Sequence, residues 1–317
     1  MTNSKVFLTG GAGFIGTHLA RALATCHEVI LFDNLHHDAY RTARLDEVVN
    51  VRLVPGDVRD LAAIRRALEP DVEYVIHAAA IAGVDTVVAD PLRVLDVNVK
   101  GTFNIAEATL GLKSLKMFVD FSTSEVFGRY AHRVDECEIR PTVTIGEPRW
   151  TYAMSKLVGE LIVHAHHLQN RMPTVTLRPF NVYGPNQVGT GAIHHFVKRA
   201  IAGEELVIHG DGSQIRAWCY VEDFVRAVLL AMESETSAGR SYNIGDPRSP
   251  VTVHTLAHMI VALSGSSSTL TFKPMSHADV TLRIPSIKAA REDLGFEPAV
   301  GLEDGLLRTI AWYRGAR

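Results

Sequence analysis

The sequence predicts an α/β fold in which a doubly wound parallel sheet is followed by a smaller C-terminal lobe. Two observations support this fold class. The first half of the chain alternates short apolar runs with segments of helical periodicity, as βαβ units do. The apolar runs are apolar on both faces, which is typical of strands covered by helices on both sides.

The expected elements of the first half follow one another in regular order. The expected strands cover residues 5–9, 28–32, 51–54, 72–77, 117–121 and 174–178, and the expected helices cover residues 14–24, 61–68, 92–109 and 150–169. Because parallel strands need a crossover connection, the intervening helices are expected to cross the faces of the sheet.

The alternation becomes less regular after residue 179. A segment rich in Gly, Asn and Pro, residues 181–191, is expected to be a loop. Further helices are expected at 192–202, 221–232 and 253–264, with short strands at 205–208 and 241–244. We therefore expect residues 1–179 to form the sheet domain, with segments near 217–246 returning to it. Residues 180–317 mainly form the smaller lobe over the carboxyl edge of the sheet.

Composition excludes several classes of protein. The 32 Lys+Arg and 35 Asp+Glu residues leave a net charge of −3, so no overall field attracts nucleic acid or an anionic membrane. Cys26, Cys137 and Cys219 lack CxxC spacing, and the histidine clusters lack HExxH or similar spacing, so no metal site is expected. Without a signal peptide or an apolar run that could span a bilayer, the chain is expected to be cytoplasmic.

A glycine-rich turn joins the first strand to the first helix. Gly10 permits a tight turn, Gly13 lets the backbone approach a pyrophosphate, and Gly16 allows close packing of helix on strand. Phe14 and Ile15 lie between these glycines at the helix N-terminus, whose free N–H groups favour phosphate. The turn therefore predicts a dinucleotide site, the alternative being a glycine turn without a ligand.

Other residues at the same sheet edge complete the predicted cofactor site. Asp33 ends the second strand, where a carboxylate accepts hydrogen bonds from ribose hydroxyls and repels a 2′-phosphate, so NAD is favoured over NADP. Small residues after the fourth strand would let the backbone approach the dinucleotide. The remaining candidate cofactor contacts are Asn34, Asp57, Val58, Ala78, Ala79, Ala80, Asn98 and Ser122.

Tyr152 and Lys156 give the strongest chemical signal. Residues four apart share a helix face, so the phenol and the ammonium can point into one cleft and contact the cofactor. We expect the ammonium to lower the pKa of the phenol and make it a base for an alcohol. Thr123, Ser124 and Glu125 follow the fifth strand, where hydroxyls can hold a substrate hydroxyl against Tyr152. The alternative is a surface Tyr–Lys pair beside a Ser/Thr-rich loop.

Six motifs in this order resemble the extended short-chain dehydrogenase/reductases that act on nucleoside-diphosphate sugars. They are TGGAGFIG, HAAA, STSEVFG, YAMSK, RPFNVYGP and GDGSQIRAWCYVED. The resemblance spans nearly the whole chain. It implies a Rossmann domain with tightly held NAD, a lobe that binds a UDP-sugar or another nucleotide sugar, and usually a homodimer formed through a four-helix interface.

The resemblance also implies roles for residues of the catalytic loop and helix. Thr123 would hydrogen-bond the sugar C4 hydroxyl, and Tyr152 would remove its proton. Lys156 would support both Tyr152 and the nicotinamide ribose. Together these residues would oxidise C4 of the sugar to a ketone.

Substrate contacts are implied in the second half of the chain. Asn181 would contact the sugar or its phosphate, and the backbone around Ala192 and Ile193 would lie near the nucleobase. Arg216 would bind the diphosphate, because a planar guanidinium on a Gly-rich loop suits that group. The alternative for Arg216 is a surface salt bridge.

The fate of the 4-keto sugar distinguishes an epimerase, a 4,6-dehydratase and a uronate decarboxylase. The sequence Thr123-Ser124-Glu125 resembles that of UDP-glucuronate decarboxylases, although GDP-mannose dehydratases carry it too. The segment that begins at Arg283 also resembles the decarboxylases, and Arg283 is expected to anchor the substrate. A Glu125 anion beside the C6 carboxylate would raise the ground-state energy, which loss of CO2 would relieve.

Two departures keep the alternatives open. Asn186 stands where decarboxylases commonly carry an arginine, and residues 81–88 are closer to epimerase and dehydratase patterns. We place the decarboxylase slightly ahead of the UDP-sugar or UDP-glucuronate 4-epimerase and the 4,6-dehydratase. A non-catalytic NAD-binding sensor is less favoured, because such proteins usually lack the Tyr or the Lys.

Overall fold

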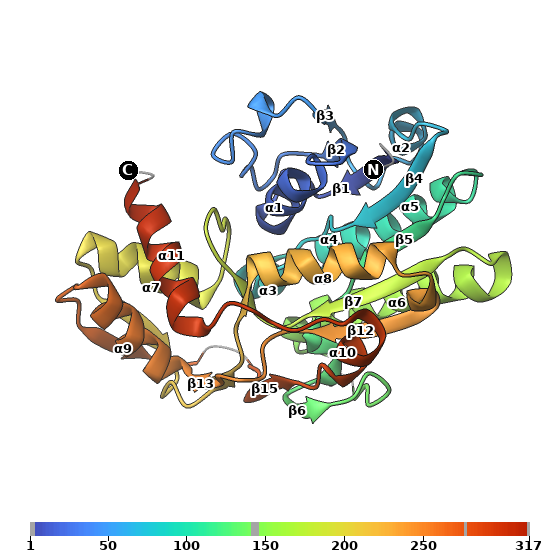
Figure 1. The fold of residues 1–317 in the computed structure, drawn as a ribbon. Helices are drawn as coiled ribbons and strands as arrows, with labels where there is room; N and C mark the ends of the chain where they lie inside the picture. Colours follow the sequence, from blue (N-terminus) through green and yellow to red (C-terminus); the bar gives the residue numbers. More distant parts are fainter. Residues whose placement is uncertain (1–3, 141–145, 276–277, 316–317) are drawn as a thin grey trace.

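The computed structural model describes residues 4–140, 146–275 and 278–315, which form a layered α/β molecule (Figure 1). Seven parallel strands make the central sheet in the order β12-β7-β5-β4-β1-β2-β3. Their bounds are β1 Ser4–Thr9, β2 His27–Asp33, β3 Val51–Pro55, β4 Val72–His77, β5 Met117–Phe121, β7 Thr174–Pro179 and β12 Arg240–Ile244. This topology confirms the expected doubly wound fold, whose strand order reverses direction at the boundary between β1 and β4.

Helices cover both faces of the sheet, as Figure 1 shows. Leu19 of α1 and Phe224 of α8 share a hydrophobic core with Leu8 of β1. Ile105 of α5 shares a second core with Phe7 on the opposite face, because successive residues of a strand point to opposite sides. The bounds of these helices are α1 Phe14–Leu23, α2 Leu61–Ala67, α3 Val84–Ala89, α4 Pro91–Leu95, α5 Gly101–Thr109, α6 Thr151–Asn170, α8 Val221–Glu233 and α10 Lys288–Leu294.

The long helix expected over residues 92–109 differs in its middle. The helical path begins at Pro91, where the Asp90 side chain accepts a hydrogen bond from the Arg93 amide. A π-helical segment, Asp96–Lys100, then separates α4 from α5. Such segments insert a residue into the helical repeat and turn the following side chains. This one carries Asn98, a candidate site residue.

The C-terminal lobe has its own hydrophobic core, formed by α7, α9 and α11. These helices are α7 Ala192–Ala202, α9 Val253–Ser264 and α11 Leu302–Gly315. Short strands form three small sheets outside the central one, in the orders β13-β10-β15-β6, β11-β8 and β14-β9. Their bounds are β6 Tyr130–Val134, β8 Val182–Tyr183, β9 Leu206–His209, β10 Ile215–Arg216, β11 Cys219–Tyr220, β13 Val251–Thr252, β14 Leu270–Lys273 and β15 Leu282–Pro285. β8 lies within the segment expected to be a loop, and most of these strands are too short for a recognisable two-residue period.

Four short 3-10 helices complete the described elements. They are η1 Leu45–Glu47, η3 Ser124–Phe127, η4 Pro148–Trp150 and η5 Glu235–Ser237. η3 and η4 matter most for the site, because they carry the loop after β5 and the turn before α6. Within the described residues, no helix combines the length and the apolar character needed to cross a lipid bilayer.

Candidate active site

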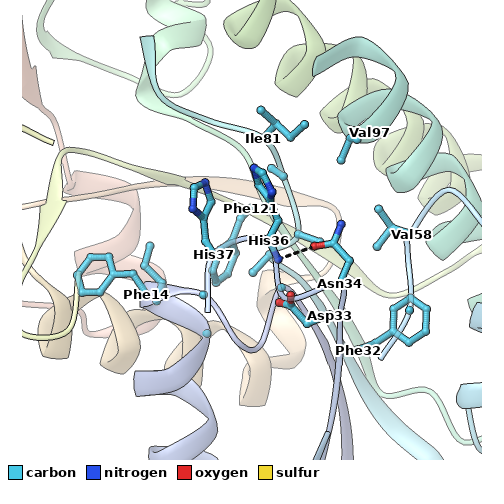
Figure 2. Close-up of a pocket in the computed structure, with 18 of the residues that line it drawn as sticks. Phe14, Phe32, Asp33, Asn34, His36, His37, Val58, Ile81, Val97 and Phe121 are labelled. Atoms are coloured by element: carbon cyan, nitrogen blue, oxygen red, sulfur yellow. Dashed lines mark hydrogen bonds between the residues drawn. The ribbon is translucent and has the colours of Figure 1, made fainter. Parts of the chain in front are cut away.

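A cavity of about 250 Å³ opens at the carboxyl edge of the sheet, beside the glycine-rich turn. Figure 2 shows the side chains around it, from the end of β2 to the start of α1. Most of the expected cofactor contacts line this cavity: Gly10, Gly13, Phe14, Ile15, Gly16, Asp33, Asn34, Val58, Ala78, Ala79 and Ala80. Its shape therefore follows the sequence-based expectation at the pyrophosphate end.

The glycine turn is packed so closely that side chains would not fit. Gly10 has φ of +71°, and a Cβ atom there would lie 2.6 Å from the backbone nitrogen of Ala79. A Cβ at Gly16 would collide with the carbonyl of Gly10. Gly13 caps α1 without a side-chain hydrogen bond, so the first-turn N–H groups stay free for an anion. These features fit the pyrophosphate of NAD.

Asp33 is held at the end of β2 by backbone hydrogen bonds. Its carboxylate accepts from the amide of Ala12 at 3.0 Å and from that of Leu35 at 2.7 Å. Burial raises the pKa of Asp33, and these two bonds oppose that effect. His36 and His37 follow in the loop above the cavity (Figure 2).

Five expected cofactor contacts lie outside the cavity lining: Asp57, Asn98, Ser122, Tyr152 and Lys156. Asp57 binds Arg59, which holds the pKa of Asp57 at about 2. Asn98 bonds the backbone N–H and C=O of Ile81, and the Ser122 hydroxyl donates to Glu160. The cavity instead includes residues that the sequence did not single out: Phe32, His36, His37, Gly56, Arg59, Ile81, Arg93, Val97, Phe121 and Val188. Several of these follow strand ends, which is the one signal that could have found them.

Tyr152 and Lys156 lie one helical turn apart on α6, below the loop after β5. Lys156 is buried and Tyr152 is partly buried. The Thr123 hydroxyl lies near the Tyr152 phenol and lowers its pKa. Thr123 also caps η3 by accepting from the Glu125 amide at 3.2 Å. The structure thus brings Thr123 and Tyr152 together as expected, with Ser124 buried beside them.

The pKa of Tyr152 differs from the expectation. Burial and the Glu125 carboxylate raise it above its ordinary value, while the Thr123 hydroxyl and the Arg149 guanidinium lower it only partly. Burial also lowers the pKa of Lys156. The prediction that Lys156 lowers the pKa of the phenol is therefore wrong, because burial and the Glu125 charge outweigh the groups that lower it.

A cluster of buried arginines surrounds Glu125. Arg149 of η4 donates to its two carboxylate oxygens at 2.6 and 2.9 Å, and Arg283 lies at 4.0 Å. Burial acts to raise the pKa of Glu125, but Arg149, Arg283 and Arg216 outweigh it and hold the pKa below its ordinary value. Glu125 is therefore an anion bound to a cation. Arg149 was not among the expected site residues, although it stands only three residues before Tyr152.

Arg216 and Arg283 are neighbours on two paired strands. The parallel register of β10 and β15 places them side by side. Arg216 donates to the carbonyl of Val280 at 2.6 Å and to Asp279 at 3.2 Å, and Arg283 donates to the carbonyl of Gly128 at 2.7 Å. Arg216 is thus a largely buried part of the same cluster as Glu125, unlike an arginine in a surface salt bridge.

The other expected substrate contacts precede these two arginines in the chain. Asn181 follows β7 with φ of +45° and donates to the carbonyl of Ala217 at 2.8 Å. Ala192 and Ile193 begin α7 in the C-terminal lobe. Asn186, by contrast, faces the sheet domain. Its side-chain amide donates to the Ala39 carbonyl at 3.0 Å and accepts a hydrogen bond from the Thr42 hydroxyl.

Comparison with known proteins agrees with this geometry. Residues 6–245 match the model of the NAD dependent epimerase/dehydratase family. A UDP-N-acetyl-alpha-D-glucosaminuronate decarboxylase of Bacillus cytotoxicus is 32% identical over 98% of this chain and 98% of its own length. UDP-glucuronic acid decarboxylase 1 of Xenopus tropicalis is 30% identical over 98% of this chain and 72% of its length.

A solved structure resembles the whole fold. The UDP-glucuronic acid 4-epimerase of Bacillus cereus, in complex with UDP-glucuronic acid and NAD, superposes with a TM-score of 0.89 at 29% identity. The match covers 99% of this chain and 100% of that one. The cofactor cleft and the Tyr–Lys pair agree with these likenesses. The chain therefore belongs to the NAD dependent epimerase/dehydratase family of enzymes that act on nucleotide sugars.

Proposed function

We propose that the protein is an NAD-dependent decarboxylase of UDP-glucuronate that forms UDP-xylose. The observation that carries this proposal is the Glu125 cluster, in which three arginines face two carboxylates, Glu125 and Asp279. Such a cluster has one positive charge in excess and favours an anionic ligand. Arg149, Arg216 and Arg283 would bind the anionic groups of the nucleotide sugar, and their surplus charge would orient its C6 carboxylate.

The first step uses Thr123 and Tyr152. The Thr123 hydroxyl orients the C4 hydroxyl of the sugar, and the Tyr152 phenolate accepts its proton. When bound in the cleft, NAD supplies the hydride acceptor and a cationic ring, which also favours the phenolate. The positive charge of that ring would oppose the burial and the Glu125 charge that raise the pKa of Tyr152.

The second step needs little from the protein beyond orientation. Once C4 is a ketone, the C6 carboxylate is β to it, so the C5–C6 bond can break and its electrons form an enolate at C4 and C5. Tyr152, now protonated, hydrogen-bonds the enolate oxygen. After CO2 has departed, the enolate takes a proton from solvent at C5. Hydride then returns to C4 while Tyr152 gives its proton back to the C4 oxygen. Since Arg149 neutralises Glu125, repulsion between Glu125 and the substrate is not the driving force expected from the sequence.

Two alternatives receive different support. A 4,6-dehydratase needs an acid and a base across C5 and C6, whereas Ser124 cannot act as that acid and Glu125 is bound to Arg149. A UDP-glucuronate 4-epimerase is the second candidate, because it needs only Thr123, Tyr152 and Lys156. The likeness to the Bacillus cereus enzyme favours it.

The assay uses UDP-glucuronate with carbon-13 at C6. A decarboxylase releases labelled CO2 in equal amount with UDP-xylose, whereas an epimerase keeps the label and forms UDP-galacturonate. UDP-N-acetylglucosaminuronate is tested in parallel, since the Bacillus cytotoxicus relative is named for it. The Tyr152→Phe variant is the control and should be inactive with NAD still bound. Formation of UDP-galacturonate without CO2 would overturn the decarboxylase proposal.

The assembly we propose is a homodimer formed through α4, α5 and α6. α5 packs against α6 on one face of the sheet, and α4 packs against α6. Large apolar side chains on these helices, and one directly after α5, are exposed to solvent within the described residues: Leu92, Leu95, Phe103, Leu110, Leu161 and Leu168. An apolar surface of this kind suits a second copy, whose matching helices would complete a four-helix interface.

A further inference from the structure

A carboxylate lies directly behind the proposed catalytic pair, in the middle of the sheet. Asp120 on β5 is fully buried, and neither carboxylate oxygen has a hydrogen-bond partner among the described residues. Phe118, two residues earlier on the strand, belongs to the core beneath α5 and α6. Because residues two apart share a strand face, Asp120 points to the same side, toward α6. An unbonded buried carboxylate needs a physical explanation.

Most polar groups around Asp120 already have partners. Glu160 accepts two hydrogen bonds from Arg178, at 2.9 and 2.7 Å, and so is neutralised. His77 lies opposite Asp120 on the neighbouring strand β4, and its two ring nitrogens form hydrogen bonds with the hydroxyls of Thr9 and Thr102. Burial also lowers the pKa of His77 to about 3, so the ring is neutral. Neither group can act as the counter-ion of Asp120.

The remaining charge is the ammonium of Lys156. Lys156 is buried on α6, which packs against β5 on the side toward which Asp120 points. The two groups form no direct ion pair, but the Asp120 charge does more than any other neighbour to oppose the effect of burial on the pKa of Lys156. Burying an isolated ammonium or carboxylate is far less favourable than burying the two together. We propose that Asp120 is the counter-ion of Lys156, a positioning residue that keeps the ammonium charged and directed toward the cofactor cleft. This proposal rests on the proposed function only through the role given to Lys156.

The direct test is the ionisation of Lys156 in an Asp120→Asn variant, which removes the charge but nearly preserves the shape. Lysine labelled with carbon-13 is titrated by NMR, and the Lys156 signal is assigned by its loss in Lys156→Arg. We expect the titration midpoint of Lys156 to fall by about one pH unit or more. Thr176→Val is the matched control, because Thr176 lies beside Asp120 on β7 and is also buried. It should leave the midpoint unchanged, and an unchanged midpoint in Asp120→Asn would overturn the proposal.

NAD binding gives an independent readout that does not require any sugar reaction. Once Lys156 loses its proton in Asp120→Asn, we expect NAD affinity to fall by about tenfold between pH 7 and pH 9. Thr176→Val should show no such pH dependence, and an equal loss in both variants at every pH would contradict the pairing. If Asp120→Asn does not fold, the double variant Asp120→Asn/Lys156→Met should fold again, and failure to do so would also contradict it. Absence of CO2 release from UDP-glucuronate would overturn the proposed function alone.

Discussion

Replacing Arg149 by methionine removes the cation that binds Glu125 most closely. The two hydrogen bonds, at 2.6 and 2.9 Å, join side chains that are only 3% and 17% exposed. Arg283, at 4.0 Å, remains but makes no hydrogen bond to the carboxylate. Because breaking a buried pair leaves an uncompensated charge, we expect Arg149→Met to lower the free energy of unfolding by about 3 kcal/mol at about pH 8.

The pH dependence of this loss follows from the pKa of Glu125. In the wild type, the pKa of Glu125 is lower in the folded than in the unfolded protein. The ion pair therefore stabilises the protein fully above the pKa of Glu125 in the unfolded state. This stability is lost as the pH falls through the pKa of Glu125 in the folded state. Without Arg149, burial dominates and raises the pKa, so the variant loses stability as pH rises through that raised value. The stability difference between wild type and variant therefore grows from about pH 5 to about pH 8.

Urea denaturation at both pH values measures this difference. Arg140→Met is the matched control, because Arg140 makes an exposed ion pair with Glu138 that should contribute at most about 0.5 kcal/mol. Adding Glu125→Gln to Arg149→Met should recover much of the lost stability, since no buried charge is then left unpaired. A cost that is the same at both pH values, or no larger than that of Arg140→Met, would refute the reasoning.

Three further predictions concern the cofactor cleft and the helix surface. Gly10→Ala should weaken NAD binding by more than about tenfold and should lower the free energy of unfolding more than Gly203→Ala does. Both glycines have positive φ, but only at Gly10 would the added Cβ meet nearby backbone. Equal losses of stability in urea would contradict this. Asp33→Asn should shift the NAD-to-NADP affinity ratio toward NADP in calorimetry, because the repulsive carboxylate is gone; an unchanged ratio would count against it. Leu161→Glu should give a monomer by light scattering, because it places a charge in the proposed interface. Val49→Glu, at an exposed valine outside the helices, is the control and should leave the dimer intact. A dimeric Leu161→Glu variant would exclude this interface.

Local patterns were sufficient to predict the fold and the cofactor end of the site. The glycine turn and Asp33 each depend on short stretches of chain, in which a strand end or a helix start fixes where the backbone lies. The strands buried on both faces were equally readable, since Phe7 and Leu8 belong to separate cores on opposite sides of the sheet. The order of the strands in the sheet required the structure.

Features that depend on distant contacts could not be predicted. The short helix Val84–Ala89 was missed, because β-branched residues make a weak helical signal. The pair of Glu125 with Arg149 joins two turns, η3 and η4, that are separated in sequence. Similarly, Asp120 is a single polar residue within an apolar strand of the sequence. Which charged groups lie near it depends on how α6 packs against the sheet. The raised pKa of Tyr152 depends on burial, which sequence spacing does not report.

The central claim is that hydride leaves C4 and returns to C4 while C6 is lost as CO2. The most direct test is UDP-glucuronate carrying deuterium at C4 and carbon-13 at C6, with products followed by NMR. We expect UDP-xylose that keeps deuterium at C4, gains one solvent hydrogen at C5 and forms in step with labelled CO2. Solvent hydrogen at C4, or turnover in which the carbon-13 stays in the sugar, would contradict it.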